Sequence, residues 1–93
     1  MNDETSALET AVRESRLRQE PVALAVVAEG PGTGNRMLVW KAGHTRGDLG
    51  WPRLNQRVAL YAEQLLERGS RQTEKSFDSN GARVLVRFEF FNG

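Results

Sequence analysis

The run VALAVVA, from Val22 to Ala28, constrains the fold of this chain more than any other feature. Its apolar residues occupy both alternating faces, whereas a strand with one face in water alternates apolar and polar residues. A strand of this kind is covered on both sides. The pattern therefore predicts that Val22–Ala28 is a central strand, in a sheet with a layer of structure on each face.

Two amphipathic helices are available to form those layers. Ser6 and Glu9 form an S-x-x-E capping box, and the apolar residues after it recur at helical spacing, which predicts a short helix ending near Glu20, because a proline follows. The main helix begins at Pro52, a residue suited to the first helical position, and ends near Gly69, which favours the left-handed conformation that terminates helices. Its apolar positions are Leu54, Val58, Tyr61, Ala62 and Leu65.

Three further strands complete the expected sheet. Arg36–Ala42 is the second strand, and the glycine-rich loop before it permits either a hairpin with the first strand or a wider crossing. Gln72–Phe77 is a weak, polar, edge-like strand, and Asn80-Gly81 is a hairpin turn signal before the strong strand Ala82–Phe91. The order α-β-β-α-β-β predicts an α+β fold in a single domain, residues 1–93, with one mixed or antiparallel sheet packed by helices.

The composition excludes several classes of function. The 13 basic and 12 acidic residues give a formal net charge of +1, which offers no strong electrostatic attraction to nucleic acid or to a membrane, so neither is expected as a partner. There is no cysteine, which excludes disulfides, thiolate chemistry and cysteine-ligated metals. The polar start MNDETSALET differs from a secretory signal, and no apolar run approaches the roughly 20 residues that span a bilayer, so we expect a cytoplasmic protein. A chain of this length buries a modest core, which a homo-oligomer would stabilise.

The stretch EGPGTGNRM, Glu29 to Met37, has the look of a phosphate-binding loop, but its spacing argues against one. A P-loop reads G-x-x-x-x-G-K-[ST] and opens a helix whose N-terminus holds the anion. Counted from Gly30, the second glycine position is Asn35 and the lysine position is Arg36. The residues RMLVWK that follow are typical of a strand. The stretch is therefore interpreted as a flexible connection between two strands.

The best candidate for a small-anion site is a group of arginines around the turn-rich stretch Ala42–Pro52. Arginine guanidinium groups beside an aromatic ring can bind a phosphate or a flat heterocycle. The N-terminus of a helix after Gly50 would add backbone N–H donors. The alternative interpretation is scattered surface arginines and two core or rim tryptophans. The group consists of Arg36, Arg46, Arg53 and Arg57, with Trp40 and Trp51 among them.

Two acid–base pairs are weaker candidates. His44 with Asp48 would supply a general base, but the favoured interpretation is a polar turn residue for His44 and a helix cap for Asp48. Glu63 and Glu67 lie one helical turn apart, on a helix face rich in polar residues that is expected to be exposed to solvent. With no nucleophile signature in the chain, the residues favour a binding module over an enzyme.

The chain resembles the N-terminal domain of the XdhC/CoxI family, the maturation factors of molybdenum-containing xanthine and carbon monoxide dehydrogenases. Where that family has a strand of the type PVALATVV, this chain has PVALAVVA, Pro21 to Ala28. A strand of the type ARMLV corresponds to NRMLVW, Asn35 to Trp40, and the motif G-x-L-G-G-G-C-V-E corresponds to GDLGWPRLN, Gly47 to Asn55. The resemblance covers roughly residues 7 to 91.

The resemblance implies a fold, a role and a set of site residues. The implied role is a non-catalytic accessory protein that binds a molybdenum-enzyme partner or holds the phosphate of the molybdenum pterin cofactor; the residues alone identify no cofactor. We expect a stand-alone relative without the family's C-terminal Rossmann-like domain. A cofactor-free homodimeric interaction or regulatory module is the alternative. The family's cysteine falls on Arg53 and its glutamate on Asn55, and the predicted cofactor-binding residues are Arg36, Arg46, Gly47, Gly50, Trp51, Arg53 and Asn55.

Overall fold

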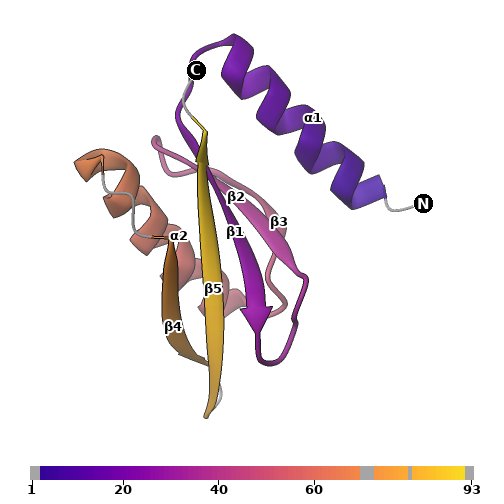
Figure 1. Cartoon of the computed structure of the whole chain (residues 1–93), viewed down its shortest axis with the longest axis vertical. Coiled ribbons are helices and arrows are strands. Elements are labelled where there is room, and N and C mark those ends of the chain that lie inside the picture. Colours follow the sequence, from indigo (N-terminus) through magenta and orange to yellow (C-terminus); the bar gives the residue numbers. More distant parts are fainter. Residues whose placement is uncertain (1–2, 70–72, 80, 92–93) are drawn as a thin grey trace.

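The computed structural model describes residues 3–69, 73–79 and 81–91, with side chains from residue 7 onward. In these ranges the elements are α1 (Asp3–Leu17), β1 (Val22–Glu29), β2 (Arg36–Trp40), β3 (Thr45–Asp48), α2 (Pro52–Arg68), β4 (Glu74–Ser79) and β5 (Ala82–Phe91). The strands form one sheet in the order β3-β2-β1-β5-β4, and every neighbouring pair is antiparallel. α1 and α2 lie on opposite sides of this sheet (Figure 1). The predicted α+β fold is confirmed, and the sheet is purely antiparallel.

β1 is the central strand of the sheet, as the apolar run predicts. It pairs with β2 on one side and with β5 on the other. Ala23, Ala25 and Val27 point into the larger core, which α2 covers. Val22 and Leu24 point into the smaller core, which α1 covers. Alternate residues of one strand therefore contribute to two cores on opposite faces of the sheet.

α2 has the bounds that its sequence signals predict. Pro52 occupies the start of the helix, and Gly69 ends it in the left-handed conformation, with φ of 69°. The Gly69 backbone N–H donates to the Leu66 carbonyl at 3.3 Å, which satisfies one of the carbonyls left unpaired at a helix end. The buried stripe of the helix consists of Leu54, Val58, Ala62 and Leu65, and Tyr61 packs at its border.

α1 differs from the prediction at both ends. The helix begins at Asp3, so Ser6 lies inside it, and the predicted capping box does not mark its start. The helix ends at Leu17 rather than near Glu20, because Gln19 adopts a positive φ of 60°. The Glu20 backbone N–H closes this turn by donating to the Ser15 carbonyl at 2.8 Å.

β3 is an element that the sequence pattern did not predict. It lies within the stretch interpreted as turns, and it pairs with β2 from Arg36↔Asp48 to Val39↔Thr45. All its residues are exposed, so no apolar alternation marks it as a strand. The observed order is therefore α-β-β-β-α-β-β.

The β1–β2 and β4–β5 hairpins form at the turns where the sequence allows them. β1 and β2 pair directly across the glycine-rich loop, which settles the choice between a hairpin and a wider crossing, and β2 ends at Trp40 instead of Ala42. In the second hairpin, β4 occupies Glu74–Ser79 rather than Gln72–Phe77, and Ser79 pairs with Ala82. Gly81 has a positive φ of 80°, as such a turn requires, whereas Gln72 and Asn80 lie outside the described residues.

Within the described part of the chain, no helix is long and apolar enough to cross a membrane.

Candidate functional site

The turn between β3 and α2 is built around the backbone of Leu49. The Leu49 side chain is fully buried, and its backbone N–H donates to Asn55 Oδ1 at 2.8 Å. Its carbonyl accepts a hydrogen bond from Asn35 Nδ2 at 2.9 Å. Since buried backbone groups are costly without partners, two asparagines from distant elements hold Leu49 in place. Asn55, one of the predicted cofactor-binding residues, is therefore part of a local hydrogen-bond network.

Asp48 completes this network. Its Oδ1 accepts hydrogen bonds from Asn55 Nδ2 at 2.9 Å and from the Gly50 backbone N–H at 2.7 Å. The Asn55 side chain, and secondly the Gly50 N–H, lower the pKa of Asp48, because both bonds stabilise the ionised carboxylate. Asp48 thus stabilises the turn before α2 rather than capping the helix, whose N-cap residue is Trp51.

The glycines of the turn allow neighbouring parts of the chain to approach their backbone closely. A Cβ at Gly47, where φ is +101°, would lie 2.5 Å from the Arg36 carbonyl oxygen on the neighbouring strand. At Gly50, where φ is +114°, a Cβ would lie 3.1 Å from Asn35 Nδ2. Trp51, the tryptophan among the predicted cofactor-binding residues, packs against the larger core, and a Cβ at Gly32 would lie 3.0 Å from its ring. These contacts show close packing of the β1–β2 loop onto the turn.

The structure distributes the arginines of the predicted group over three places. Arg36 and Arg46 lie on the α1 side of β2 and β3, and their strand register makes them diagonal neighbours, with Cα atoms about 7–8 Å apart. Arg53 is exposed in the first turn of α2. Arg57 lies one turn further along α2 and donates from Nη1 to the Asp78 carbonyl at 3.0 Å. Only Arg36 and Arg46 are thus neighbours on one strand pair.

Arg36 and Arg46 line separate hollows on the two flanks of α1. The Arg36 hollow is apolar, with Leu8, Val12, Leu24 and Phe91 in its wall. The Arg46 hollow lies between α1 and β3, and it is polar. Its wall consists of Ala11, Glu14, Arg18, Trp40, His44, Thr45 and Arg46.

An aromatic stack lies in the Arg46 hollow. The exposed His44 ring stacks on Trp40, with centroids 4.7 Å apart and planes at 15°. Trp40 is buried, and its Nε1–H donates to the buried hydroxyl of Ser15 on α1 at 2.7 Å. Sequence reasoning included Trp40 in the arginine group but missed both the stack and the bond to Ser15, for which the sequence carries no local signal. The hydroxyl and the indole are far apart in the chain.

The predicted His44–Asp48 pair does not form a site. His44 immediately precedes β3 and Asp48 ends it, so the two lie about 13 Å apart along an extended strand, and Asp48 is bonded to the α2 turn. Glu63 lies near Gly43, where an added Cβ would be 3.3 Å from its Oε1, and the Glu63–Glu67 pair stays a prediction. Among the described residues, no three histidine, cysteine, aspartate or glutamate side chains come together as metal ligands would.

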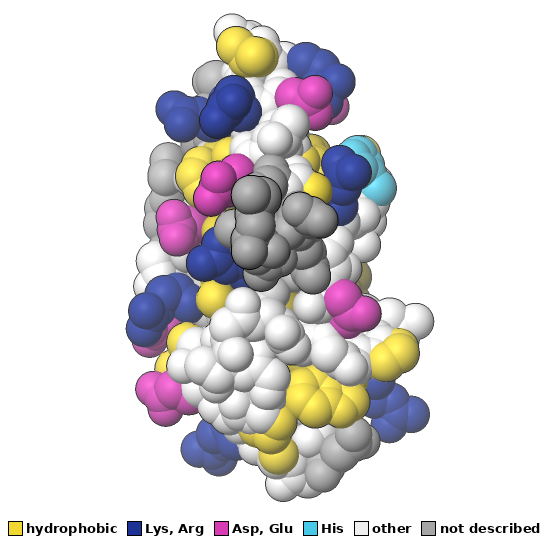
Figure 2. All heavy atoms as spheres, turned by 90° about the vertical axis from the view of Figure 1, so that its right-hand side faces the viewer, with side chains coloured by type: hydrophobic (Ala, Val, Ile, Leu, Met, Phe, Trp, Pro, Cys, Tyr) yellow, Lys and Arg dark blue, Asp and Glu magenta, His cyan; other side chains and the backbone are white. Residues whose placement is uncertain are grey.

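The surface around the Arg46 hollow carries both signs of charge. Figure 2 shows basic and acidic side chains interspersed on one side of the molecule, in the part that the structure describes. Arg18 on the wall of the hollow is itself paired with Glu20 at 3.1 Å. The attraction that this hollow offers to an anion is therefore local: it comes mainly from Arg46, and the Glu14 side chain on the same wall opposes it.

Fold and site together define a small antiparallel α+β domain with a polar hollow between α1 and β3, in which His44 stacks on Trp40. Residues 15–78 match the XdhC and CoxI family, from the end of α1 to β4. Since this match spans most of the sequence, the chain belongs to the XdhC and CoxI family. The family is associated with the maturation of molybdenum enzymes. Among curated proteins, none matches the chain.

Proposed function

We propose that this protein is a non-catalytic accessory factor in molybdenum-enzyme maturation, which acts by binding a partner enzyme or the molybdenum pterin cofactor. The observation that carries the proposal is the family match over residues 15–78. In the part of the chain that the structure describes, His44 stacks on Trp40 and is separated from Asp48, so the predicted His44–Asp48 pair does not form.

The residues of the Arg46 hollow fit two parts of such a cofactor. Arg46, which shares the wall of the hollow with Arg18 and Glu14, provides guanidinium donors for a phosphate, and the exposed His44 ring offers an aromatic surface for a flat heterocycle. This chain offers the molybdenum no thiolate ligand, because its sequence has no cysteine. The chain would hold the cofactor by its organic part, and the molybdenum would keep the ligands that it brings.

The remaining predicted residues have supporting roles in this proposal. Gly47 and Gly50 permit the close approach of the backbone, and Asn55 fixes the turn that carries Asp48. Trp51 packs beneath the β1–β2 loop. Arg53, which stands at the family's cysteine position, is exposed beside the α2 N-terminus and would provide a further contact with a phosphate or with a partner.

Arg46→Gln tests the cofactor site. Titration of the molybdenum pterin cofactor, released anaerobically from a molybdenum enzyme, is followed by tryptophan fluorescence. We expect Arg46→Gln to weaken binding by about tenfold or more, because a charge-assisted bond to phosphate contributes roughly 1.5–3 kcal/mol. Arg13→Gln, at an exposed position of α1, removes the same charge elsewhere and is the matched control. Equal affinities of the two variants would contradict the Arg46 site.

Native mass spectrometry of the protein purified gently from its host tests the role itself. A mass increment of a molybdenum pterin species, or a co-purified dehydrogenase subunit, is the expected result. A bare homodimer would instead favour the alternative of a cofactor-free interaction module. The observation that favours this alternative is the α1 side of β5, where Leu85 and Phe91 are only partly buried between exposed charges.

A further inference from the structure

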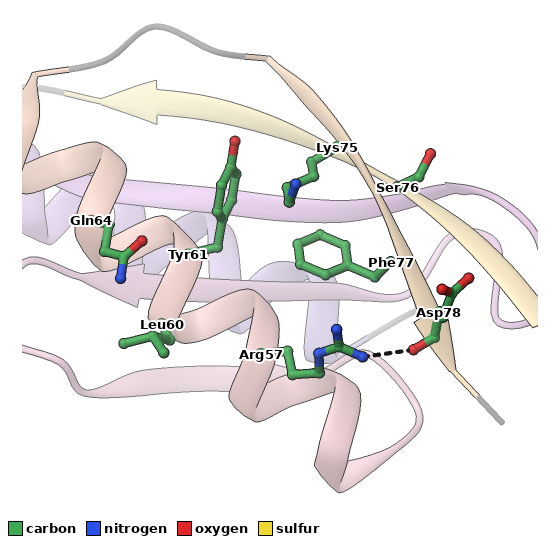
Figure 3. Close-up of a pocket in the computed structure, with 8 residues that line it drawn as sticks. All are labelled: Arg57, Leu60, Tyr61, Gln64, Lys75, Ser76, Phe77 and Asp78. Carbon is green, nitrogen blue, oxygen red and sulfur yellow. Dashed lines mark hydrogen bonds between the residues drawn. The ribbon is translucent and has the colours of Figure 1, made fainter.

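A groove runs between α2 and the edge strand β4, on the opposite edge of the sheet from Arg46. It has a volume of about 310 Å³, room for side chains of a bound segment. α2 contributes Arg57, Leu60 and Tyr61, and β4 contributes Lys75 and Phe77 (Figure 3). We call this surface the α2–β4 groove. Neither the family match nor the Arg46 hollow accounts for it.

The backbone of β4 presents alternate groups to the outside of the sheet. The Thr73 carbonyl accepts from the Phe88 N–H at 2.7 Å, so Thr73 faces β5. In an antiparallel ladder without a bulge, Lys75 and Phe77 then face β5 as well, and Ser76 and Asp78 direct their backbone groups away from it. The Asp78 carbonyl confirms this direction, because it accepts from Arg57 Nη1. Ser76 is the outward position at the middle of the strand.

The charged side chains that enter the groove are cationic. Arg57 lies along it, and Lys75 Nζ lies 5.0 Å from the centroid of the Tyr61 ring. Asp78 contributes its carbonyl oxygen to the groove, while its carboxylate points away (Figure 3). An occupant with negative side chains would therefore meet two positive charges and no lining carboxylate.

The groove also has an apolar surface that the fold covers only in part. The rings of Tyr61 and Phe77 meet edge to face, with centroids 5.9 Å apart, and form its floor. Leu60 stands at the rim with 58% of its surface exposed. An edge strand beside an apolar floor is the arrangement to which extended peptides add as a further strand, with backbone bonds giving affinity and side-chain pockets giving selectivity.

We propose that the α2–β4 groove binds an acidic, extended segment of a partner protein as an additional strand on β4. Backbone bonds form at Ser76 and at the Asp78 N–H, acidic side chains pair with Arg57 and Lys75, and apolar ones rest on Tyr61 and Leu60. This inference does not depend on the cofactor role. It concerns the opposite edge of the sheet, so either proposal can fail alone.

The probe is the acetylated and amidated octapeptide Glu-Thr-Val-Thr-Glu-Thr-Val-Thr (the Glu-Val peptide), whose Glu and Val side chains lie on the same face of an added strand. The same peptide with Lys in place of Glu (the Lys-Val peptide) is the charge control. Binding is measured on the full chain by NMR, together with amide hydrogen exchange. We expect the Glu-Val peptide to bind, the Lys-Val peptide not to bind, and the exchange of the Ser76 and Asp78 amides to slow by about tenfold at saturation. The Lys75 and Phe77 amides, which already bond to β5, should change little. Equal binding of both peptides, or no slowing at Ser76, would overturn the proposal.

Variants separate the backbone and charge contributions. Ser76→Pro removes an outward N–H and leaves the bonds to β5, so it should abolish binding in a folded protein. Arg57→Gln with Lys75→Gln keeps the backbone and should weaken binding at least about tenfold. Arg13→Gln, on α1, should leave the affinity within about twofold, as expected for a distant exposed charge. Unchanged affinity in the double variant would refute the pairing, even if Ser76→Pro proved unstable.

Discussion

Asn55 illustrates how one side chain can decide the chemistry of a turn. Its amide accepts from the Leu49 N–H and donates to Asp48, so both ends of the group are used. A glutamate, which the family has at this position by the resemblance, could accept from Leu49 but could not donate to Asp48. Two carboxylates would then face each other. The asparagine is therefore matched to Asp48, and the turn before α2 is stabilised without any ligand.

Gly47 and Gly34 allow a test of close packing at the residue scale. Both have positive φ, +101° and +97°, so alanine strains the backbone at each. A Cβ at Gly47 would lie 2.5 Å from the Arg36 carbonyl oxygen, whereas a Cβ at Gly34 would have no neighbour within 4 Å among the described atoms. We expect Gly47→Ala to lower the free energy of unfolding by roughly 1–3 kcal/mol more than Gly34→Ala, because the strands must separate.

Urea unfolding of the two glycine variants measures this difference. Gly34→Ala serves as the control for backbone strain alone. Similar losses in both variants would mean that β3 adjusts around the added methyl group, and that Gly47 is required only for its φ.

At the scale of elements, α1 is held by a smaller core than α2. That core contains Leu8, Ala11, Val22, Leu38 and Trp40. The bond from Trp40 Nε1 to the Ser15 hydroxyl links the helix to β2 inside this core. A buried polar pair of this kind fixes the position of one element on another, because either group is costly when left without its partner.

Ser15→Ala should loosen α1 selectively. The substitution leaves the buried indole N–H without an acceptor, which we expect to cost roughly 1–3 kcal/mol in the free energy of unfolding. Amide exchange should become faster in α1 than in α2, since the larger core is unchanged. Thr10→Ala, at an exposed position on the same helix, is the control and should change stability by less than about 0.5 kcal/mol. A uniform loss of protection in both helices would show that the two cores unfold together.

The elements that were predicted correctly are those with strong periodic signals. β1, α2 and β5 bury regular apolar residues, and their patterns in the sequence are direct consequences of that burial. β3 was missed because every residue in it is exposed, and its only evidence is pairing with β2. The C-terminal end of α1 was misplaced because a positive φ at Gln19, not the following proline, stops the helix.

The candidate site depended on the whole molecule, and the sequence predicted only part of it. Spacing along the chain grouped four arginines, but the fold separates them onto both sides of the sheet and leaves Arg36 and Arg46 as neighbours. The stack of His44 on Trp40 depends on the short turn between β2 and β3, and β3 itself was not predicted. Local motifs could therefore indicate the residue types of the hollow, but not which of them meet.

The last prediction concerns self-association of the whole molecule. α2 covers one face of the sheet, while on the α1 side Val26 and Leu85 stay partly exposed, with Arg87 and Glu89 beside them. In a two-fold dimer the same surface of each copy meets the other. A face that carries both positive and negative side chains can therefore pair the basic residues of one copy with the acidic residues of the other. With a net charge of only +1, repulsion between copies is weak.

Sedimentation velocity over a range of concentrations measures this association. We expect a reversible dimer that weakens by about tenfold or more in Leu85→Lys, because a charge replaces apolar surface at the contact. Leu60→Lys places the same change on the α2 side and is the matched control, which should leave the dimer intact. A protein that stays monomeric at high concentration would refute the dimer and remove the main support for a homodimeric module. Loss of the dimer in Leu60→Lys would instead move the contact to the α2–β4 groove, where it would compete with an acidic partner segment.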